Sequence, residues 1–271
     1  MTTNKLIKRT LMVAAISAIV ACTVSPTGRK QFILTQFTGS ELNQMGATAY
    51  ADLKKKQTLS QDAGTNGYVG CVTKAILAAM PGDEGSGWEI NVFNDDTPNA
   101  FALPGKKIGV HSGLLKVAKN QDQLAAVIGH EIGHVQAQHS AERLSQQFAA
   151  QGALLVGGII AATSDSPQKG LAMGALGAGI TYGVLMPFSR TQESEADIIG
   201  LRLMAEAGFD PAESITLWQN MASVDNSKTP EFLSTHPSDQ TRMSSLGRAL
   251  PMAEEDMKIA RKAGRRPNCK I

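Results

Sequence analysis

The residues with the clearest capacity for chemistry are two histidines and a glutamate in the run His130-Glu131-Ile132-Gly133-His134. If this run is helical, His130 and His134 stand four residues apart on one face, so both rings can bind one metal ion. Glu131 lies one residue round the helix from the first ring. A catalytic zinc site takes three protein ligands, commonly imidazole nitrogens, and leaves one position open for water. The spacing therefore predicts two of three ligands.

A long helix is expected to hold these residues. Asn120, with Gln123 three residues on, forms a capping-box pattern that predicts a helix from there to about Ala150. Its apolar stripe consists of Leu124, Val127, Ile128, Ile132 and Val135. Burying two histidines and a glutamate in such a stripe is costly unless they have a partner or a function, which favours a metal site over a chance motif.

The third ligand has to come from elsewhere in the chain. The sixth residue after His134 is Ser140 rather than histidine, which disfavours the metzincin arrangement. A second helix is predicted over 189–208, and there Glu193 and Asp197 share one face. One of these carboxylates can bind the metal while the other accepts the free ring N–H of a ligand histidine.

The two patterns together resemble a known family. A His-Glu-x-x-His run followed by Glu-x-x-x-Asp is similar to the gluzincin metallopeptidases of the CAAX prenyl protease and HtpX type, and within them to a periplasmic lipoprotein branch. The resemblance extends over about 25–250. Further matching segments are Asn99-Ala100-Phe101-Ala102-Leu103-Pro104-Gly105, Gly113-Leu114-Leu115, and Ser234-Thr235-His236-Pro237 with Arg242 beyond.

The resemblance implies a role for each site residue and one Zn2+ per chain. Glu193 is the third zinc ligand, and Asp197 lies behind a ligand histidine. Glu131 is the general base for the water that zinc activates. His236 is the candidate donor to the oxyanion, although it can instead cap the zinc and keep the enzyme latent, or be a plain loop histidine. Arg242 is expected to pair with a carboxylate of the site.

Other polar residues near these motifs receive weaker assignments. By the same resemblance Asn99 could line the substrate cleft. Glu195 is expected to be a solvated carboxylate, and His139, five residues past His134, to turn away from the metal as a structural or exposed side chain. His111, just after a strand predicted over 106–110, receives no role. That strand is a candidate for holding substrate along a sheet edge.

These elements predict an α+β fold: a mainly helical, zincin-like domain with a small β-sheet whose edge strand binds substrate. Strands are expected over 88–92 and 106–110, joined through the turn-rich 99–105. The predicted helices cover 40–57, 68–80, 120–150, 189–208, a segment from Pro211, and 239–250. Without internal repeats or low-complexity linkers, 40–271 is predicted to be a single metallopeptidase domain.

The N-terminal segment predicts export. A basic start, an apolar run from Leu11 to Val20 and a small residue before Cys22 are typical of a signal peptide, here 1–21. Ile19-Val20-Ala21-Cys22 resembles the bacterial lipobox, so Cys22 is expected to be lipidated and 22–39 to be a tether. An ordinary signal peptide with an incidental cysteine is the alternative. Since Thr23 rather than aspartate follows, the predicted location is the periplasmic face of the outer membrane.

Export affects the expected state of the two remaining cysteines and the net charge of the mature chain. Cys71 and Cys269 form an even pair in an oxidising compartment and are expected to be disulfide-bonded, with two unpaired thiols as the alternative. The chain has 26 basic and 24 acidic residues, and loss of the three positive charges of the signal peptide takes the net charge from +2 to −1. Such a balance gives no indication of a nucleic-acid partner.

One stretch invites a different interpretation. The residues from Gly170 to Ser189 include no charged side chain over 20 positions, which is long enough for a membrane span. A span there would need a second one to bring His134 and Glu193 to the same metal, and no other apolar run is long enough. The stretch is therefore interpreted as a lid, a buried core helix or a membrane contact.

The leading hypothesis is a zinc-dependent endopeptidase, lipid-anchored in the bacterial envelope, that cleaves misfolded or misassembled envelope proteins. Its expected partners are those polypeptides, the membrane and outer-membrane assembly machinery. One alternative is a chaperone-like or latent zinc lipoprotein. Another is a zinc amide hydrolase acting on peptidoglycan. Glu131 disfavours a purely structural metal site, which would need a fourth protein ligand and no base.

Overall fold

The fold is seen in a computed structural model that describes residues 20–161, 188–223, 231–236 and 240–271. The predicted signal peptide, 1–21, and the uncharged stretch 170–189 lie almost entirely outside these ranges, so the interpretations of both stay predictions. Within the described ranges, no helix has both the length and the apolar character needed to cross a membrane.

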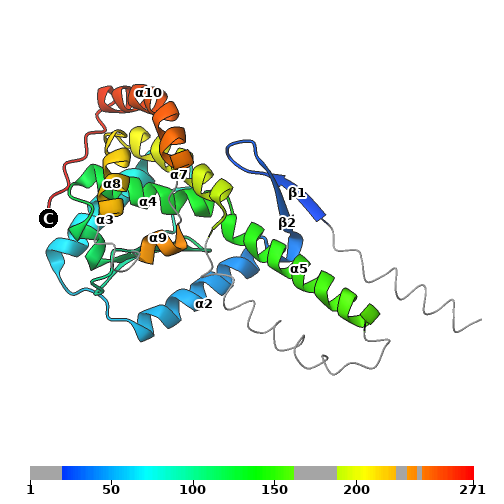
Figure 1. Cartoon of the computed structure of the whole chain (residues 1–271). Coiled ribbons are helices and arrows are strands. Elements are labelled where there is room, and N and C mark those ends of the chain that lie inside the picture. The colour runs from blue at the N-terminus through cyan, green and yellow to red at the C-terminus, as the bar shows by residue number, and fades with distance from the viewer. Residues whose placement is uncertain (1–19, 162–187, 224–230, 237–239) are drawn as a thin grey trace, which may run out of the picture.

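Helices make up most of the chain, which confirms the predicted α+β, mainly helical class (Figure 1). They are α2 (Ser40–Lys56), α3 (Ala63–Ala79), α4 (Gln121–Gln136), α5 (His139–Ala161), α7 (Arg190–Glu206), α8 (Glu213–Ser223), α9 (Glu231–Thr235) and α10 (Gln240–Lys262), with short 3-10 turns η1 (Thr35–Phe37) and η2 (Ser112–Lys116). Helix α4 is central: it contacts α7, α3, α8 and the small sheet. The main hydrophobic core lies among these elements.

The small sheet has three strands, β3 (Glu89–Phe93), β4 (Ala100–Leu103) and β5 (Lys107–His111), in the order β3-β5-β4. Strand β5 is parallel to β3 and antiparallel to β4. The prediction that the strand over 106–110 offers a free edge is therefore wrong, because β5 is the middle strand. The edge next to it is β4, within a segment expected to be only a connection. Positive φ angles at Gly105 and Lys106 make the tight turn that returns the chain.

The two helices that carry the motifs touch through glycines. A Cβ atom on Gly200 of α7 would lie 2.6 Å from the backbone nitrogen of His130, and one on Gly129 would lie 2.8 Å from the carbonyl oxygen of Gly200. One turn further, a Cβ on Gly133 would lie 2.9 Å from the carbonyl oxygen of Ala196. Only glycine permits such an approach, so these residues let α4 and α7 pack backbone to backbone.

Two helix predictions need correction. The helix expected over 120–150 is two helices, because the chain turns at Gln138, whose φ of 53° lies in the left-handed region. Asn120 does cap α4, accepting from the backbone of Gln123 at 2.8 Å. The last helix, expected over 239–250, continues to Lys262, since Pro251 is accommodated inside α10.

The residues expected to form a tether, 22–39, are instead ordered against the domain. Strands β1 (Val20–Val24) and β2 (Lys30–Leu34) form an antiparallel hairpin beside α5 (Figure 1). Ile33 and Leu34 are buried in a small core with Leu144 of α5. The backbone N–H of Leu34 also donates to Ser145 Oγ at 2.8 Å. Apolar burial and hydrogen bonds thus fix the hairpin to α5.

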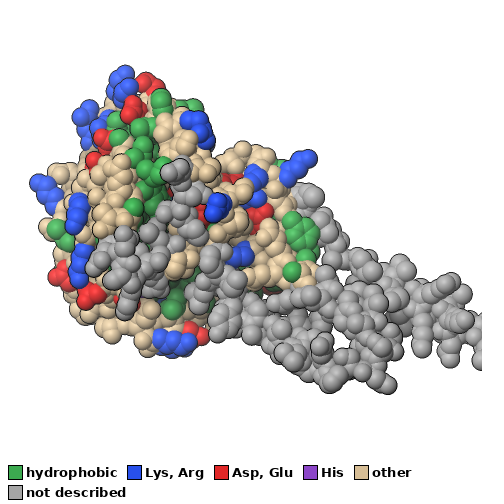
Figure 2. Space-filling view, in the orientation of Figure 1, with side chains coloured by type: hydrophobic (Ala, Val, Ile, Leu, Met, Phe, Trp, Pro, Cys, Tyr) green, Lys and Arg blue, Asp and Glu red, His purple; other side chains and the backbone are tan. Residues whose placement is uncertain are grey.

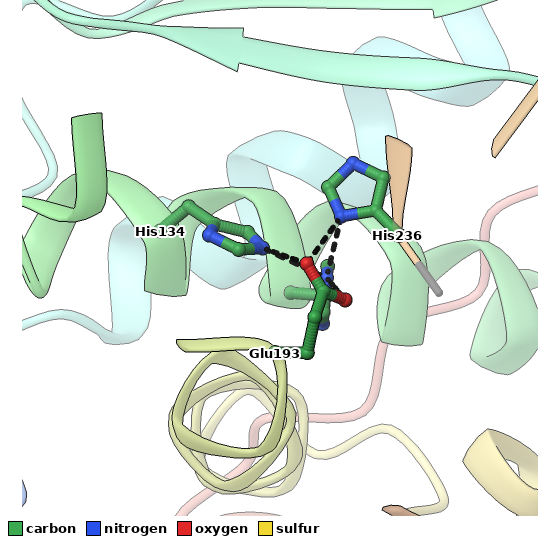
Figure 3. A group of neighbouring side chains, drawn as sticks. His134, Glu193 and His236 are labelled. Carbon is green, nitrogen blue, oxygen red and sulfur yellow. Dashed lines mark hydrogen bonds and ion pairs between the residues drawn. The ribbon is translucent and has the colours of Figure 1, made fainter. Parts of the chain in front are cut away.

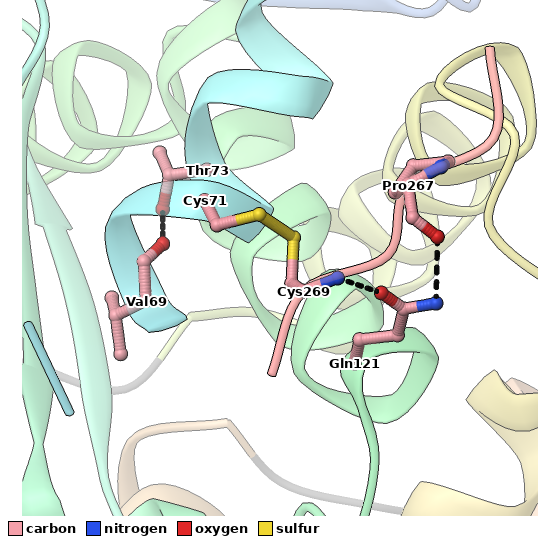
Figure 4. The surroundings of a disulfide bond; sticks show 6 residues. All are labelled: Val69, Cys71, Thr73, Gln121, Pro267 and Cys269. Carbon is pink, nitrogen blue, oxygen red and sulfur yellow. Dashed lines mark hydrogen bonds between the residues drawn. A yellow bond between two sulfur atoms is a disulfide. The ribbon is translucent and has the colours of Figure 1, made fainter. Parts of the chain in front are cut away.

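A disulfide ties the C-terminal segment to α3. It joins Cys71 to Cys269, across 198 residues of sequence (Figure 4). Gln121, the first residue of α4, accepts from the backbone of Cys269 and donates to the carbonyl oxygen of Pro267. The C-terminal segment is therefore fixed beside the start of the motif helix.

Charges are mixed on the surface. On the face in Figure 2, basic and acidic side chains are interspersed, and a band of hydrophobic side chains descends from the region of α10. This distribution matches the near balance of 26 basic and 24 acidic residues. All five histidines, by contrast, are buried.

Candidate metal centre

Four buried side chains converge at the centre of the domain: His130, His134, Glu193 and His236. One potential ligand atom from each lies within 4.8 Å of the others. Nε2 of His130 is 3.0 Å from Nε2 of His134, and the Glu193 carboxylate is 3.4 Å from His134 Nε2. Nδ1 of His236 is 3.0 Å from Glu193 and 3.2 Å from His130 (Figure 3). The structure thus brings together all three predicted ligands and His236.

Local structure explains how each of these residues reaches the centre. Helix α4 presents His130 and His134 one turn apart. Helix α7 begins at a capping box in which Ser189 and Gln192 bond reciprocally, so Glu193 lies in its first turn. His236 directly follows the short helix α9, and its backbone N–H donates to the carbonyl oxygen of Phe232 at 2.7 Å.

The donor set fits a divalent metal ion. Nδ1 of His130 is engaged by Asp197, and Nδ1 of His134 by His139. Both Nε2 atoms therefore face one point beside the Glu193 carboxylate, where a shared cation would take the place of a proton. Ligands of a tetrahedral zinc ion bound at about 2.0–2.1 Å lie roughly 3.3 Å apart, close to the separations found here.

His130 is supported directly from α7. Its Nδ1 is 2.9 Å from an oxygen of Asp197. Asp197 in turn accepts two hydrogen bonds of 2.7 Å from Arg242, whose third nitrogen is 2.8 Å from Glu193. Arg242 is itself buried and stacks 4.1 Å from the centre of the Trp218 ring. This guanidinium therefore holds both the ligand carboxylate and the carboxylate behind His130.

His134 is supported by a residue expected to turn away. His139 is fully buried, and its Nδ1 lies 2.9 Å from Nδ1 of His134. A continuous helix would direct the two rings apart, but the left-handed turn at Gln138 redirects the chain and brings His139 back to the ligand. The prediction that His139 turns away was wrong because that turn was not foreseen.

Glu195 is also buried, contrary to its predicted role as a solvated carboxylate. One of its oxygens is 3.1 Å from Nε2 of His139 and accepts from Nε of Arg29 at 2.6 Å. Its other oxygen accepts from the hydroxyls of Ser25 and Thr27. The prediction failed because these partners come from the hairpin, more than 160 residues away in the sequence.

Electrostatics differ between the two ligand histidines. Burial favours neutral imidazole in both, yet hydrogen bonding to Asp197 and Glu193 outweighs it at His130 and raises its pKa to about 9. At His134, burial dominates and lowers the pKa well below its usual value, with a contribution from nearby His130. Burial opposes ionisation of Glu193, but the surrounding histidines outweigh it and lower that pKa. A carboxylate therefore faces a neutral imidazole at His134.

Glu131 lies beside this cluster in a distinctive state. Its side chain is buried, and its Oε1 has no hydrogen-bond partner among the described residues. Nε2 of His236 is 3.4 Å from that oxygen. Burial raises the pKa of Glu131. A buried carboxylate with a free oxygen and a raised pKa is suited to taking and releasing a proton.

Aromatic side chains complete the site, and the sequence interpretation had missed them. Phe188 stacks on His134 at 3.9 Å between ring centres, and Phe232 stacks on His236 at 4.5 Å. The Arg143 guanidinium lies 4.1 Å from the centre of Phe188. Because Phe188 directly precedes the capping residue of α7, and Phe232 lies four residues before His236, their positions beside the motifs were an available signal.

The remaining predicted residues are not among the four side chains of the cluster. Asn99, proposed for the cleft, is buried just before β4, and its Oδ1 has no hydrogen-bond partner in the described part of the chain. Its role stays a prediction. Cys22 lies in β1, and its lipidation is likewise untested. His111 is buried and contacts Thr97, with Nδ1 3.1 Å from the hydroxyl.

Comparison with known proteins decides the family. The model of peptidase family M48 matches residues 65–249, which includes both motifs. The chain belongs to peptidase family M48. This M48 chain is 41% identical to the mitochondrial metalloendopeptidase OMA1 of Schizosaccharomyces pombe over 69% of its length and 53% of that protein. It is 32% identical to metalloendopeptidase OMA1 of Bos taurus over 85% of its length and 46% of that protein.

A bacterial relative also matches. The M48 chain is 36% identical to the beta-barrel assembly-enhancing protease of Escherichia coli over 56% of its length and 32% of that protein. The chain thus spans about half or less of the relatives it matches. Four relatives named as mitochondrial enzymes, from two fungi, a plant and cattle, are 32–41% identical to it. These relatives contradict the predicted location at a bacterial outer membrane, and that prediction is wrong on this comparison.

Proposed function

We propose that this chain is a zinc-dependent endopeptidase whose ligands are His130, His134 and Glu193 and whose general base is Glu131. One observation carries the proposal: three ligand atoms meet at one point, and beside them a buried carboxylate keeps an oxygen free of hydrogen bonds from the described residues. Membership of a peptidase family and relatives named metalloendopeptidases support the same chemistry.

The chain's own residues then act on the proton and the substrate. Zinc, when bound, supplies a Lewis acid and lowers the pKa of a water. Glu131 takes a proton from that water and delivers it to the leaving amine, a transfer for which its raised pKa is favourable. Asp197 and His139 engage Nδ1 of the two ligand rings and so direct both Nε2 atoms inward.

Strand β4 is the proposed docking edge for a peptide. It lies at the end of the three-stranded sheet and contacts α4, the helix that carries Glu131. An extended substrate that added a strand beside β4 would expose its peptide bonds to the site. We propose that Asn99, just before that edge and with an Oδ1 unpaired among the described residues, accepts from the substrate backbone.

Cleavage of an unfolded protein tests the proposal. The full-length chain, purified in detergent, is expected to cleave casein, and Glu131→Gln is expected to reduce the rate by about 100-fold or more, the usual contribution of a general base. Zinc content, measured by elemental analysis, should be unchanged in this variant and lost in His130→Ala. Equal cleavage by Glu131→Gln and the parent chain would overturn the assignment.

His236 favours a second, latent state of the same site. Its Nδ1 faces the ligand cluster at 3.0 and 3.2 Å, as a fourth ligand would. In this orientation it would occupy the position that water needs. If this arrangement restrains the enzyme, His236→Ala should cleave casein faster than the parent; if His236 instead stabilises the oxyanion, the same variant should be slower by about 100-fold.

The proposed substrates are misfolded or misassembled polypeptides at a membrane surface, to which a lipid on Cys22 would hold the enzyme. The lipobox-like sequence before Cys22 supports the attachment, and the relatives named for assembly and metalloendopeptidase activity support the substrate class. Mass spectrometry of the N-terminal peptide from cells would test the lipid attachment. A mature N-terminus at acylated Cys22 is expected, and an unmodified cysteine would exclude the anchor.

A further inference from the structure

The β1–β2 hairpin approaches the metal centre through a chain of polar contacts. His134 is 2.9 Å from His139, His139 is 3.1 Å from Glu195, and Glu195 is bonded to three side chains of the hairpin, those of Ser25, Thr27 and Arg29. We propose that this hairpin is a functional part of the metal centre, which positions ligand His134 through His139 and Glu195. The proposal rests on the proposed function and adds a control element to it.

The series of hydrogen bonds from Glu195 through His139 to His134 is called the relay below. The chemistry of its groups fixes which atom donates at each step. A carboxylate only accepts, so Nε2 of His139 must donate to Glu195. In a neutral ring, Nδ1 of His139 is then an acceptor, and the N–H opposite it belongs to Nδ1 of His134. Nε2 of His134 is left with its lone pair toward Glu193 and His130, as a metal ligand requires. Each hydrogen bond thus fixes the tautomer of the next ring.

Arg29 fixes the far end of the relay. Its Nε donates to Glu195 at 2.6 Å, and its two terminal nitrogens donate to both oxygens of Glu142 at 2.7 and 2.8 Å. Glu142 accepts a further bond from Gln192 at 2.8 Å, in the first turn of α7. Arg29 therefore connects the hairpin with α5 and α7, and it leaves Glu195 oriented toward His139.

A second contact of the hairpin reaches the end of the ligand helix. Gln31 of β2 is buried and donates to the carbonyl oxygen of Ala137 at 2.6 Å. Ala137 is the C-cap residue of α4, three positions past His134 and immediately before the turn at Gln138. The hairpin thus braces both the His139 ring and the backbone turn that presents it. A displacement of the hairpin would therefore shift the His134 ring.

Two matched pairs of variants separate this role from a merely structural one. Glu195→Gln and Glu142→Gln each remove one carboxylate from Arg29, but only Glu195 contacts His139. Arg29→Gln and Lys30→Gln each remove one positive charge from the hairpin, but only Arg29 belongs to the network, since Lys30 is exposed. The full-length protein in detergent is stripped of metal and titrated with Zn2+ against a chromophoric chelator, and its Co2+ absorption spectrum and melting temperature are recorded.

The relay predicts about 10- to 100-fold weaker zinc binding, with an altered Co2+ spectrum, for Glu195→Gln and Arg29→Gln. Lys30→Gln should bind zinc as the parent does, and Glu142→Gln, which leaves Glu195 in contact with His139, should weaken zinc binding less than Glu195→Gln does, even where it lowers the melting temperature. If both members of each pair bind zinc equally, the proposal is overturned, whatever their stability. Should Glu195→Gln fail to fold, the Arg29 pair decides alone.

The proposed function is tested separately in the same titration. Loss of tight zinc binding in His130→Ala, compared with the parent, shows that the ligand set is correct. If the parent itself binds no zinc, the proposed function fails. If the parent binds zinc and the matched pairs do not differ, only the role of the hairpin fails.

Discussion

The two ligand histidines stand one turn apart on the same helix, yet they are supported differently. His130 contacts a carboxylate directly, and Arg242 holds that carboxylate from α10. His134 contacts a second histidine, and its support reaches Arg29 in the N-terminal hairpin. The segment matched by the family model, 65–249, contains all of the first support but not the hairpin end of the second. The support of His130 is therefore contained within the matched segment, whereas the support of His134 depends on the hairpin that precedes this segment.

The largest expected effect breaks the support of His130. Arg242→Leu would leave the buried carboxylates of Asp197 and Glu193 without their guanidinium partner, and removing one member of a buried ion pair commonly costs about 3–5 kcal/mol. We expect a loss of that size in the free energy of unfolding, measured with urea, together with loss of zinc. Arg248→Leu, at an exposed position of the same helix, should change stability little. Similar losses in the two variants would contradict the assigned role.

A smaller change compares the two supports at their carboxylates. Asp197→Asn turns one of the two hydrogen bonds from Arg242 into a donor–donor contact and weakens the acceptor of His130. We expect about 10- to 100-fold weaker zinc binding, at least as large as for Glu195→Gln, because Asp197 touches a ligand and Glu195 acts through His139. Competition with a chromophoric chelator measures the zinc affinity of both variants. A larger effect of Glu195→Gln would reverse the proposed ranking of the supports.

The contact between α4 and α7 can be disturbed on the His130 side alone. A methyl group at position 200 would meet the backbone of His130, so Gly200→Ala should destabilise the chain by about 1–3 kcal/mol. Thermal unfolding measures the effect. Gly247→Ala is the control, because a Cβ there meets no atom within 4 Å among the described residues outside its own stretch of helix, and α10 should gain slightly in stability. Equal melting temperatures for the two variants would show that the helices can separate without cost.

The smallest effect is expected at an ion pair outside both supports. Hydrogen bonds and charge attraction from Lys54, followed by those from Lys107, lower the pKa of Glu89 to about 2. The stabilisation that this ion pair gives the folded state is therefore present above the ordinary pKa near 4.5 and is lost as the pH falls toward 2. Because Glu89 is partly exposed, the effect should stay below about 1 kcal/mol. Urea unfolding from pH 6 to 3 should show a slightly flatter loss of stability in Glu89→Gln. An unchanged pH profile would mean that the pair contributes nothing.

The support of His130 could be predicted from the sequence, whereas that of His134 could not. Glu193, Asp197 and Arg242 lie at positions set by helical spacing and by a family pattern, and the structure brings all three to the cluster. His139 reaches His134 only because Gln138 adopts a left-handed conformation that local residue types do not demand. Helical spacing applied across that turn gave the wrong direction for the ring.

The hairpin and the sheet edge were hidden for a related reason. Pro26 and Gly28 mark a turn between β1 and β2, but the partners that order this segment, Glu195 and Glu142, are distant in sequence. For strand β4 the sequence pattern likewise predicts a connection, since its four residues lie between turn signals. Long-range pairing decides both, and spacing along the chain does not report it.

The contact of α4 with α7 through glycines has a consequence for motion. Because Gly200 lies against the backbone of His130, the separation of the two helices at this point is set by backbone contact and not by a side-chain rotamer. We therefore expect the two helices to shift together and to retain the spacing of His130, His134 and Glu193 when neighbouring elements move. His236, which follows α9 and lies outside this pair of helices, can change its distance from the ligands without altering their mutual geometry.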